Sequence, residues 1–362
     1  MIYFFTTQRN ALPLCAHRRS MAEHLRSWFV PLAYESLAYW RDRSLVAGGT
    51  YVFTDTEVLS AENGRTAAEI HALIRSVGGR VLNDPSRVLT RSALLTTLKL
   101  RGINSFDVGS VDDRSTLSFP VFLRSATRHE GSYTSLIYDR RELERALTAS
   151  FLTGRAIDDL LVVEFCDVAD REGLYRKYGA FIVGETVIPR HVFFGRSWMV
   201  KQSDLETPEL LAEELEYIRT NPHEAQLREI ARVAGIDYGR IDYGILGGRI
   251  QVWEFNTNPV VGGATHISAA RRERTDRFLQ RINTAFEDLA GRPQSDLDHL
   301  PDPCRDRDGS ITPSLTARSR RRLQLRQRQW FRYLLHVASA VARPLVMAYV
   351  ERRHDAAREP RR

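Results

Sequence analysis

The sequence predicts an α/β protein whose folded body carries a basic tail, and three observations support this. Strand-like runs alternate with helical stretches before residue 88, which is typical of a parallel α/β sheet. Longer runs rich in β-branched and aromatic residues, joined by glycine turns, follow residue 174 and indicate antiparallel hairpins. Residues 316–362 contain thirteen arginines and three acidic residues, a net charge of +10 against +7 for the whole chain.

The first 88 residues form the predicted small α/β unit. Its expected elements are a strand at 2–5, a helix at 20–39, a strand at 50–54, a helix at 66–77 and a strand at 80–82. Thr66 and Glu69 match the spacing of a capping box, and Gly78-Gly79 ends that helix. Asp55 and Glu57 follow a strand where a ligand could reach them, although solvated turn residues have the same pattern.

Composition indicates an ordinary globular protein, with 43% hydrophobic and 27% charged residues. Three cysteines, Cys15, Cys166 and Cys304, are far apart and lack the spacing of a metal or redox motif, so we expect a reducing, cytoplasmic location. The start, MIYFFTTQRN, has no basic region before its apolar run and does not resemble a secretory leader.

The stretch 239–259, GRIDYGILGGRIQVWEFNTNP, predicts a hairpin that turns at Gly247-Gly248. A two-residue turn would pair Asp242 with Trp253 and place Glu254 on the opposite face. A three-residue loop, Gly247 to Arg249 with a left-handed bulge, would pair Asp242 with Glu254. We expect the bulged loop.

That register brings Asp242, Glu254 and Asn256 together, because residues two apart on a strand share a face. Two carboxylates and an amide oxygen, with no His or Cys, suit Mg²⁺ held together with nucleotide phosphates. An ordinary surface hairpin with polar side chains in water is the alternative.

An aspartate followed twelve residues later by the glutamate of E-x-N, in a segment ending NTNP, resembles the metal-binding end of ATP-grasp enzymes, in particular the glutathione synthetase-like and glutamate-ligase-like branches. The resemblance covers roughly residues 2–290. It implies an ATP-grasp fold with an α+β lid, divided as 1–88 (pre-ATP-grasp domain), 89–160 (lid subdomain), 161–290 (C-terminal subdomain with the metal site), 291–315 (linker) and 316–362 (basic amphipathic tail).

The resemblance also implies nucleotide-binding residues. Arg91, before the lid helix, and Arg124, at the end of FPVFLR, hold positions of phosphate-binding cations. Arg124 holds the position of a lysine, and arginine at both positions departs from the family pattern. Glu164 and Phe165 hold the hinge that meets adenine, and Asp167 is a third candidate. The implied cofactors are ATP and one or two Mg²⁺ ions, which Mn²⁺ could replace.

Lys177 and Arg190 are the expected catalytic cations, because they lie on predicted strands among apolar neighbours where they could offset phosphate charge; Lys177 could also bind the nucleotide. For His191 a structural and a catalytic role both stay open. The implied activity is ATP-dependent joining of a carboxylate to an amine or a thiol through an acyl-phosphate. A kinase on the same scaffold and a non-catalytic, membrane-associated nucleotide-binding scaffold are the alternatives.

The tail 316–362 lies outside the resemblance. Its segment WFRYLLHVASAVARPLVMAYV contains Arg332, His336, Arg343 and Pro344, so it is too polar to span a bilayer comfortably. An amphipathic helix on an anionic membrane surface is the functional interpretation, which would make the protein peripherally attached. Packing on the body or on a partner is the alternative, and nucleic-acid binding by the arginines is less favoured.

Overall fold

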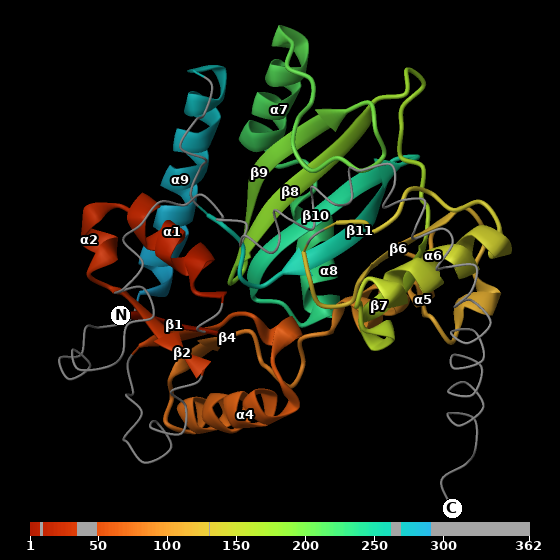
Figure 1. The fold of residues 1–362 in the computed structure, drawn as a ribbon. Coiled ribbons are helices and arrows are strands. Elements are labelled where there is room, and N and C mark those ends of the chain that lie inside the picture. The colour runs from red at the N-terminus through yellow and green to blue at the C-terminus, as the bar shows by residue number, and fades with distance from the viewer. Residues whose placement is uncertain (8–9, 35–48, 130, 262–268, 291–362) are drawn as a thin grey trace, which may run out of the picture. The chain divides into compact units, whose positions relative to one another are not determined.

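A computed structural model describes residues 1–7, 10–34, 49–129, 131–261 and 269–290 (Figure 1). Within this part of the chain there are two compact units. The first contains the described residues of 1–94 together with those from 168 onward, and the second contains residues 95–167. The predicted segments 291–315 and 316–362, with their linker and membrane interpretations, lie outside the described residues.

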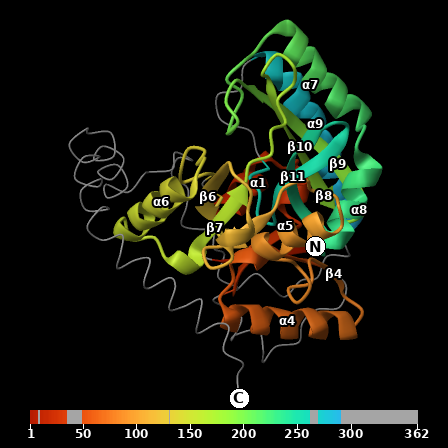
Figure 2. The ribbon, with the colours of Figure 1, turned by 90° about the vertical axis from the view of Figure 1, so that its right-hand side faces the viewer.

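A parallel sheet begins the first unit, as predicted, but it has four strands where three were expected. Its strands are β1 (Ile2–Thr6), β2 (Phe29–Ala33), β3 (Thr50–Phe53) and β4 (Arg80–Leu82), in the order β2-β1-β3-β4. Helix α4 (Ala61–Ser76) runs along one face of this sheet (Figure 2). β1 and β3 are neighbouring parallel strands, so their carboxyl ends lie side by side. The strand that follows β1 lies on one side of this pair, and the strand that follows β3 lies on the other side.

The helix expected at 20–39 is wrong. Instead α1 (Leu12–Ser20) and the short α2 (Glu23–Arg26) precede strand β2. The run Phe29-Val30-Pro31-Leu32-Ala33 pairs with β1 over its full length, and four of its five residues are buried. Pairing with a buried strand therefore decides its conformation, and Pro31 is tolerated because β2 is an edge strand.

The predicted capping box of α4 is also wrong. The helix begins one and a half turns earlier, where the Ser60 side chain accepts a hydrogen bond from the amide of Asn63. Thr66 lies inside the helix and donates to the Glu62 carbonyl. The predicted end is confirmed, since Gly78 has φ +80° and the Gly79 amide donates to the Ile74 carbonyl.

An antiparallel sheet in the order β11-β10-β8-β9 forms the rest of the first unit. Its strands are β8 (Tyr175–Val183), β9 (Thr186–Gly195), β10 (Tyr238–Leu246) and β11 (Arg249–Asn256). Three helices accompany it in the chain: α7 (Pro208–Thr220), α8 (Glu224–Ala234) and α9 (Ala269–Leu289). Helices α7, α8 and α9 all contact β9 (Figure 1).

One apolar core joins the two sheets of this unit. It combines Phe4 of β1, Phe181 of β8, Tyr238 of β10 and the α9 residues Phe278 and Phe286. Each of these side chains is fully buried, and the rings of Phe4, Tyr238 and Phe286 contact one another edge to face or tilted. The parallel sheet, the antiparallel sheet and α9 are therefore held in one packed body.

The second unit contains a small antiparallel sheet in the order β5-β7-β6. Its strands are β5 (Val108–Ser110), β6 (Val121–Ser125) and β7 (Leu160–Glu164), and α6 (Arg140–Leu152) packs on them through Leu143 and Leu147. Asp139 caps α6 by accepting from the Glu142 amide. Helix α5 (Arg91–Leu100) begins in the first unit and continues into the second. The architecture is thus the predicted mixture of a parallel α/β unit and antiparallel sheets.

Among the described residues, none of the helices has the length and apolarity that crossing a bilayer requires. Cys166 is a free thiol, whereas Cys15 is disulfide-bonded.

Candidate functional site

The β10–β11 hairpin pairs Asp242 with Glu254 as predicted, but its turn and its bulge differ from the prediction. Leu246 pairs with Arg249, so the turn is the two-residue Gly247-Gly248, with φ of +56° and +79°. The expected three-residue loop is wrong. The extra residue lies further along β11, where the register shifts between Asp242 and Tyr243 and leaves Trp253 as a bulge. Asp242 consequently lies opposite Glu254.

This register places four polar side chains on one face of the hairpin. Asp242 pairs with Glu254 and Arg240 with Asn256, and residues two apart on a strand share a face. Asp242 is buried, while Glu254 and Asn256 are partly exposed. The three predicted metal ligands are therefore neighbours, and Arg240 joins them as a residue that sequence analysis missed. The spacing Arg-x-Asp at the start of β10 was the available signal.

Each carboxylate of this group has a basic partner. Arg240 contacts both oxygens of Asp242, at 2.7 and 3.2 Å, and the Lys177 ammonium lies 2.8 Å from Oδ2. Arg91 donates to Glu254 Oε2 at 2.9 Å, and both of these side chains are largely buried. The structure thus brings together five predicted site residues from four elements: Arg91, Lys177, Asp242, Glu254 and Asn256.

Asp242 stays ionised although it is buried. Burial alone raises the pKa of a carboxyl, but the neighbouring Arg240 and Lys177 outweigh this and hold the pKa of Asp242 well below its usual range. A charged carboxylate among oxygen donors at a sheet face is suited to a hard cation.

Gly179 leaves room for a histidine beside the hairpin. On β8, Gly179 pairs with Asp242 on one side and with His191 of β9 on the other. A Cβ at position 179 would lie 2.6 Å from both Cε1 and Nε2 of His191, so only glycine lets the imidazole lie across the middle strand. His191 also stacks on Phe193, with ring centroids 3.9 Å apart. Burial lowers the pKa of His191 well below its usual value.

Arg190, a predicted catalytic residue, is on β9 where the register with β8 shifts. Its guanidinium lies over the Phe278 ring of α9, 4.5 Å from the centroid. Burial, reinforced by Arg240, lowers the pKa of Arg190 to about 10. Unlike Lys177, Arg190 has no carboxylate within ion-pair distance among the described residues.

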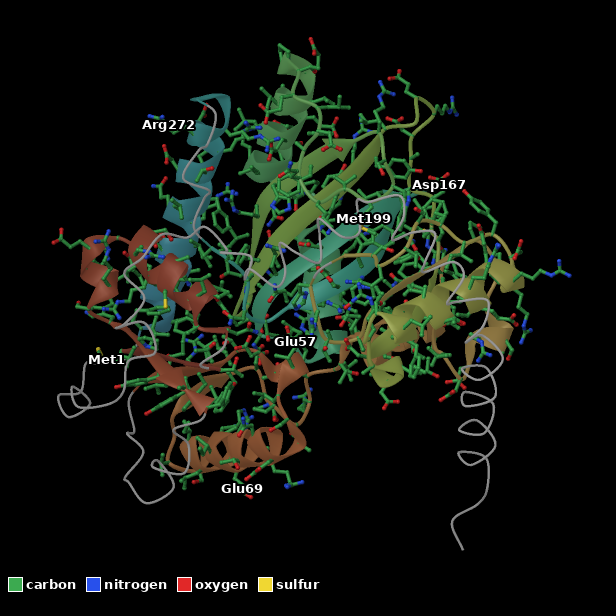
Figure 3. The ribbon with its side chains drawn as sticks, in the orientation of Figure 1. Met1, Glu57, Glu69, Asp167, Met199 and Arg272 are labelled. Carbon is green, nitrogen blue, oxygen red and sulfur yellow. The ribbon has the colours of Figure 1, made fainter. Side chains whose placement is uncertain are left out.

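The segment Thr257-Asn258 after β11 is anchored to the parallel sheet. Glu57 accepts hydrogen bonds from the amide and the hydroxyl of Thr257. Asn258 donates to Asp55 Oδ1 at 3.0 Å, and Asp55 also accepts from Thr6, Thr7 and Asn10. Figure 3 shows Glu57 at this junction. The interpretation of Asp55 as a solvated turn residue is wrong, because it is 2% exposed, and its hydrogen bonds make it a structural anchor.

The remaining predicted residues lie in the second unit. Arg124 is buried on β6, where it pairs with Leu161 of β7. The Glu164 carboxylate accepts the backbone amides of Asp107 and Ser118, at 2.9 and 2.7 Å. The amides of Glu164 and Phe165 donate to the carbonyls of Asp107 and Pro120. The backbone amides of these two residues are therefore already paired. Asp167 ends this unit, and the predicted roles of these residues remain predictions.

Within the described ranges, no group of three His, Cys, Asp or Glu side chains is arranged to hold a metal. The hairpin set contains two carboxylates, Asp242 and Glu254, and the third oxygen comes from an amide. The Asn256 Oδ1 accepts the amide of Asn258 at 2.8 Å, which fixes the direction of this side chain. A carbonyl oxygen has a second lone pair, so this bond leaves Asn256 able to bind a cation.

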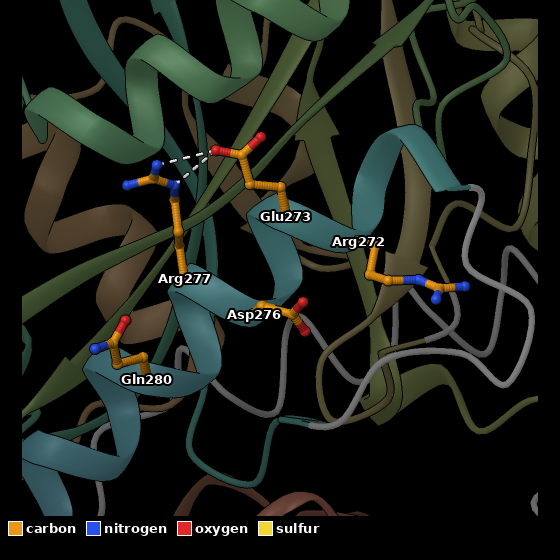
Figure 4. Close-up of a pocket in the computed structure, with 5 residues that line it drawn as sticks. All are labelled: Arg272, Glu273, Asp276, Arg277 and Gln280. Atoms are coloured by element: carbon orange, nitrogen blue, oxygen red, sulfur yellow. Dashed lines mark hydrogen bonds and ion pairs between the residues drawn. The ribbon is translucent and has the colours of Figure 1, made fainter.

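An open hollow lies along α9 and is lined by Arg272, Glu273, Asp276, Arg277 and Gln280 (Figure 4). All five come from one helix, and Arg277 and Glu273 pair with each other at 2.9 Å. No side chain of the hairpin group contributes to it. We therefore assign no ligand to this surface.

No known protein-family profile matches the sequence, and no curated protein is detectably similar to it in sequence. Several solved structures resemble the chain. D-alanine–D-alanine ligase from Bacillus anthracis, complexed with ATP, is 14% identical over 80% of this chain and 97% of that chain, with a TM-score of 0.45. The RimK domain protein ATP-grasp from Sphaerobacter thermophilus is 16% identical over 80% and 98%, with a TM-score of 0.43. VanG D-Ala:D-Ser ligase from Enterococcus faecalis is 12% identical over 80% and 97%, with a TM-score of 0.44.

Proposed function

We propose that this chain is an ATP-grasp enzyme, an ATP- and Mg²⁺-dependent ligase that activates a carboxylate. One observation carries the proposal. Asp242, Glu254 and Asn256 share one hairpin face, and Lys177, Arg240 and Arg91 surround them. Oxygen donors beside cations are what a metal-bound triphosphate requires, because the donors hold the metal and the cations face the phosphate oxygens.

The donor set fits Mg²⁺. It consists of oxygens only, and the low pKa of Asp242 keeps its carboxylate charged. Asp242, Glu254 and Asn256 would hold one or two ions. The bound metal would neutralise charge on the β- and γ-phosphates during phosphoryl transfer.

The chemistry assigned to the chain's own residues is electrostatic. A carboxylate is a poor electrophile, so its oxygen first takes the γ-phosphoryl group of ATP, which releases ADP and forms an acyl-phosphate. The amine or thiol then attacks the acyl carbon and phosphate leaves, while the nucleophile loses its proton. Lys177 and Arg240 lie beside Asp242, where they would offset charge on the transferring group. These two reaction steps do not require a covalent nucleophile from the enzyme.

The second unit would contribute Arg124, Glu164, Phe165 and Asp167 as nucleotide-binding residues. Its own geometry supports an adenine contact through carbonyl oxygens at the end of β7, because the amides there are already paired. The formation of a C–N bond, in preference to a thioester, is part of the proposal.

One observation favours the non-catalytic alternative. Both carboxylates of the hairpin are already paired with basic side chains, so a metal must compete with Arg240, Lys177 and Arg91. A phosphate chain resolves this conflict, because it gives the same cations new anionic partners. The proposal therefore requires metal and nucleotide to bind together.

The test is ADP release by the full-length protein with Mg·ATP and a panel of carboxylic acids, with and without amine acceptors. A ligase releases ADP in amounts that depend on both acid and acceptor. Release that depends on one substrate and yields a stable phosphorylated product would identify a kinase. Nucleotide binding without any turnover would favour the scaffold.

A further inference from the structure

Three arginines gather where α9 lies beside β9, next to the hairpin group. Arg190 comes from β9, and Arg271 and Arg274 come from the first turns of α9. The Arg271 guanidinium is 5.9 Å from the ring centroid of Phe193, the same ring on which His191 stacks. The cluster therefore adjoins the row of residues that leads through Gly179 to Asp242.

The cluster has too little negative charge. Arg274 pairs with Glu214, and both side chains are about 4% exposed. Glu214 is also 3.9 Å from Arg271, whose Nε lies 3.0 Å from the partly exposed Glu206. One buried carboxylate thus serves two arginines, and Arg190 has none within ion-pair distance in the part of the chain that the structure describes.

Unused hydrogen-bond donors accompany the excess charge. Among the described residues, Arg271 Nη2 is buried without a hydrogen-bond partner. The Arg190 guanidinium contacts the Phe278 ring and, within the described residues, forms no ion pair. A buried donor without an acceptor, as at Arg271, is costly, which points to a ligand that completes the site.

The neighbouring positive charges in the cluster also affect the pKa of Arg190. Burial, with Arg240 and Arg271 nearby, lowers the pKa of Arg190 to about 10, even though Glu214 acts in the opposite direction. An added anion would relieve this repulsion and supply the missing acceptors.

We propose that Arg190 and Arg271 form a subsite for an oxyanion, a carboxylate or a phosphate, carried by the substrate in addition to the group that is activated at the hairpin. The assignment of this anion to a substrate rests on the proposed function, whereas the anion site itself does not. Planar guanidinium forks bind such groups in a bidentate way. The Arg190 and Arg271 guanidinium groups lie 4.5 and 5.9 Å from the ring centroids of Phe278 and Phe193. The expected substrate is therefore a dicarboxylic acid, an acceptor with its own carboxylate, or a phosphorylated compound.

The experiment titrates the full-length protein with inorganic phosphate, with glutarate and with uncharged glutaramide, by calorimetry. Wild type is expected to bind one or both anions and not glutaramide. Arg271→Gln is expected to weaken anion binding by about tenfold or more, because a charge-assisted bidentate contact is lost. Arg271→Lys keeps the charge but loses the planar fork, so its anion affinity should lie between those of wild type and Arg271→Gln. The anion that binds more tightly identifies the chemical class.

Arg272→Gln is the matched control, since it removes the same charge from the neighbouring, exposed position of α9 (Figure 4). It should bind the anions like wild type. Equal binding by wild type and Arg271→Gln, or no binding of either anion by wild type at millimolar concentration, would overturn the subsite. If Arg190→Gln does not fold, the variants Arg271→Gln and Arg271→Lys still test the anion subsite.

Titration of the same variants with Mg·ATP separates this proposal from the proposed function. Arg271-dependent binding of glutarate or phosphate by a protein that does not bind Mg·ATP would leave the subsite standing and remove the ligase. Mg·ATP binding without Arg271-dependent anion binding would remove the subsite and leave the ligase proposal standing.

Discussion

Asp242 and Glu254 lie directly opposite each other on neighbouring strands, with Trp253 as the bulged residue beside the pair. A Cβ at Gly244 would lie 2.8 Å from the Trp253 ring, so the glycine makes room for the bulged tryptophan. This arrangement sets the candidate site, because it turns Asp242, Glu254 and Asn256 to one face.

Arg91→Met is expected to destabilise the protein by about 2–4 kcal/mol, because it leaves the largely buried Glu254 carboxylate without this ion pair. Urea denaturation measures the change. Arg219→Met is the control, since its pair with Glu216 is more than half exposed and contributes less than about 1 kcal/mol. Equal losses in the two variants would contradict a buried role for Arg91.

Asn83→Gly should cost about 3 kcal/mol, because the Asn83 side chain makes four hydrogen bonds. It donates to the carbonyls of Phe53 and Tyr238 and accepts from the amides of Asp237 and Tyr238, all within 2.9 Å. Glycine tolerates the φ of +60° at this position, so backbone strain does not contribute. Thermal or chemical denaturation tests this, and a loss below about 1 kcal/mol would show that the hydrogen bonds contribute little.

His17→Phe is expected to stabilise the protein, most strongly at low pH. His17 is buried against Phe4, Phe29 and Phe286, and within the described ranges neither ring nitrogen has a hydrogen-bond partner. Burial lowers its pKa from 6.5 to about 3. Between these values the unfolded chain binds a proton that the folded protein does not, so stability falls as pH drops below 6.5, by about 1.4 kcal/mol per pH unit.

Denaturation of wild type and His17→Phe at pH 7.5 and pH 5 measures this difference. The variant should gain about 1 kcal/mol at pH 7.5 and about 2 kcal/mol more at pH 5. A gain that is the same at both pH values would mean that His17 is not held neutral in the fold.

Much of the fold could be predicted from sequence because local signals and packing agree there. The strands 175–183 and 186–195 carry apolar runs bounded by a glycine turn, and these runs were predicted as antiparallel hairpin strands. Residues 29–33 could not be assigned locally, because pairing with β1 makes them a strand.

The residues that belong to the site could be predicted better than the contacts between them. The bulge at Trp253 has no glycine to mark it, so the turn at Gly247-Gly248 was given the extra residue instead. The anchoring of Thr257 and Asn258 by Glu57 and Asp55 spans about 200 positions of the chain, and no sequence pattern indicates such a contact.

Lys177→Met is expected to lower kcat by about 100-fold once a turnover assay exists, because it removes a charge 2.8 Å from Asp242 at the proposed site of phosphoryl transfer. Lys201→Met is the control, since this exposed lysine lies in the loop after β9. Comparable effects of both substitutions on kcat would indicate that general charge, and not the position of Lys177, matters.

The most direct test of the central claim is a calorimetric titration of the full-length protein with Mg·ATP, comparing wild type with Glu254→Gln. We expect binding by wild type that requires the metal and is abolished by the substitution, while Glu216→Gln, on an exposed helix face, binds normally. Metal-independent binding, or binding that Glu254→Gln leaves unchanged, would contradict a metal–nucleotide site on the β10–β11 hairpin.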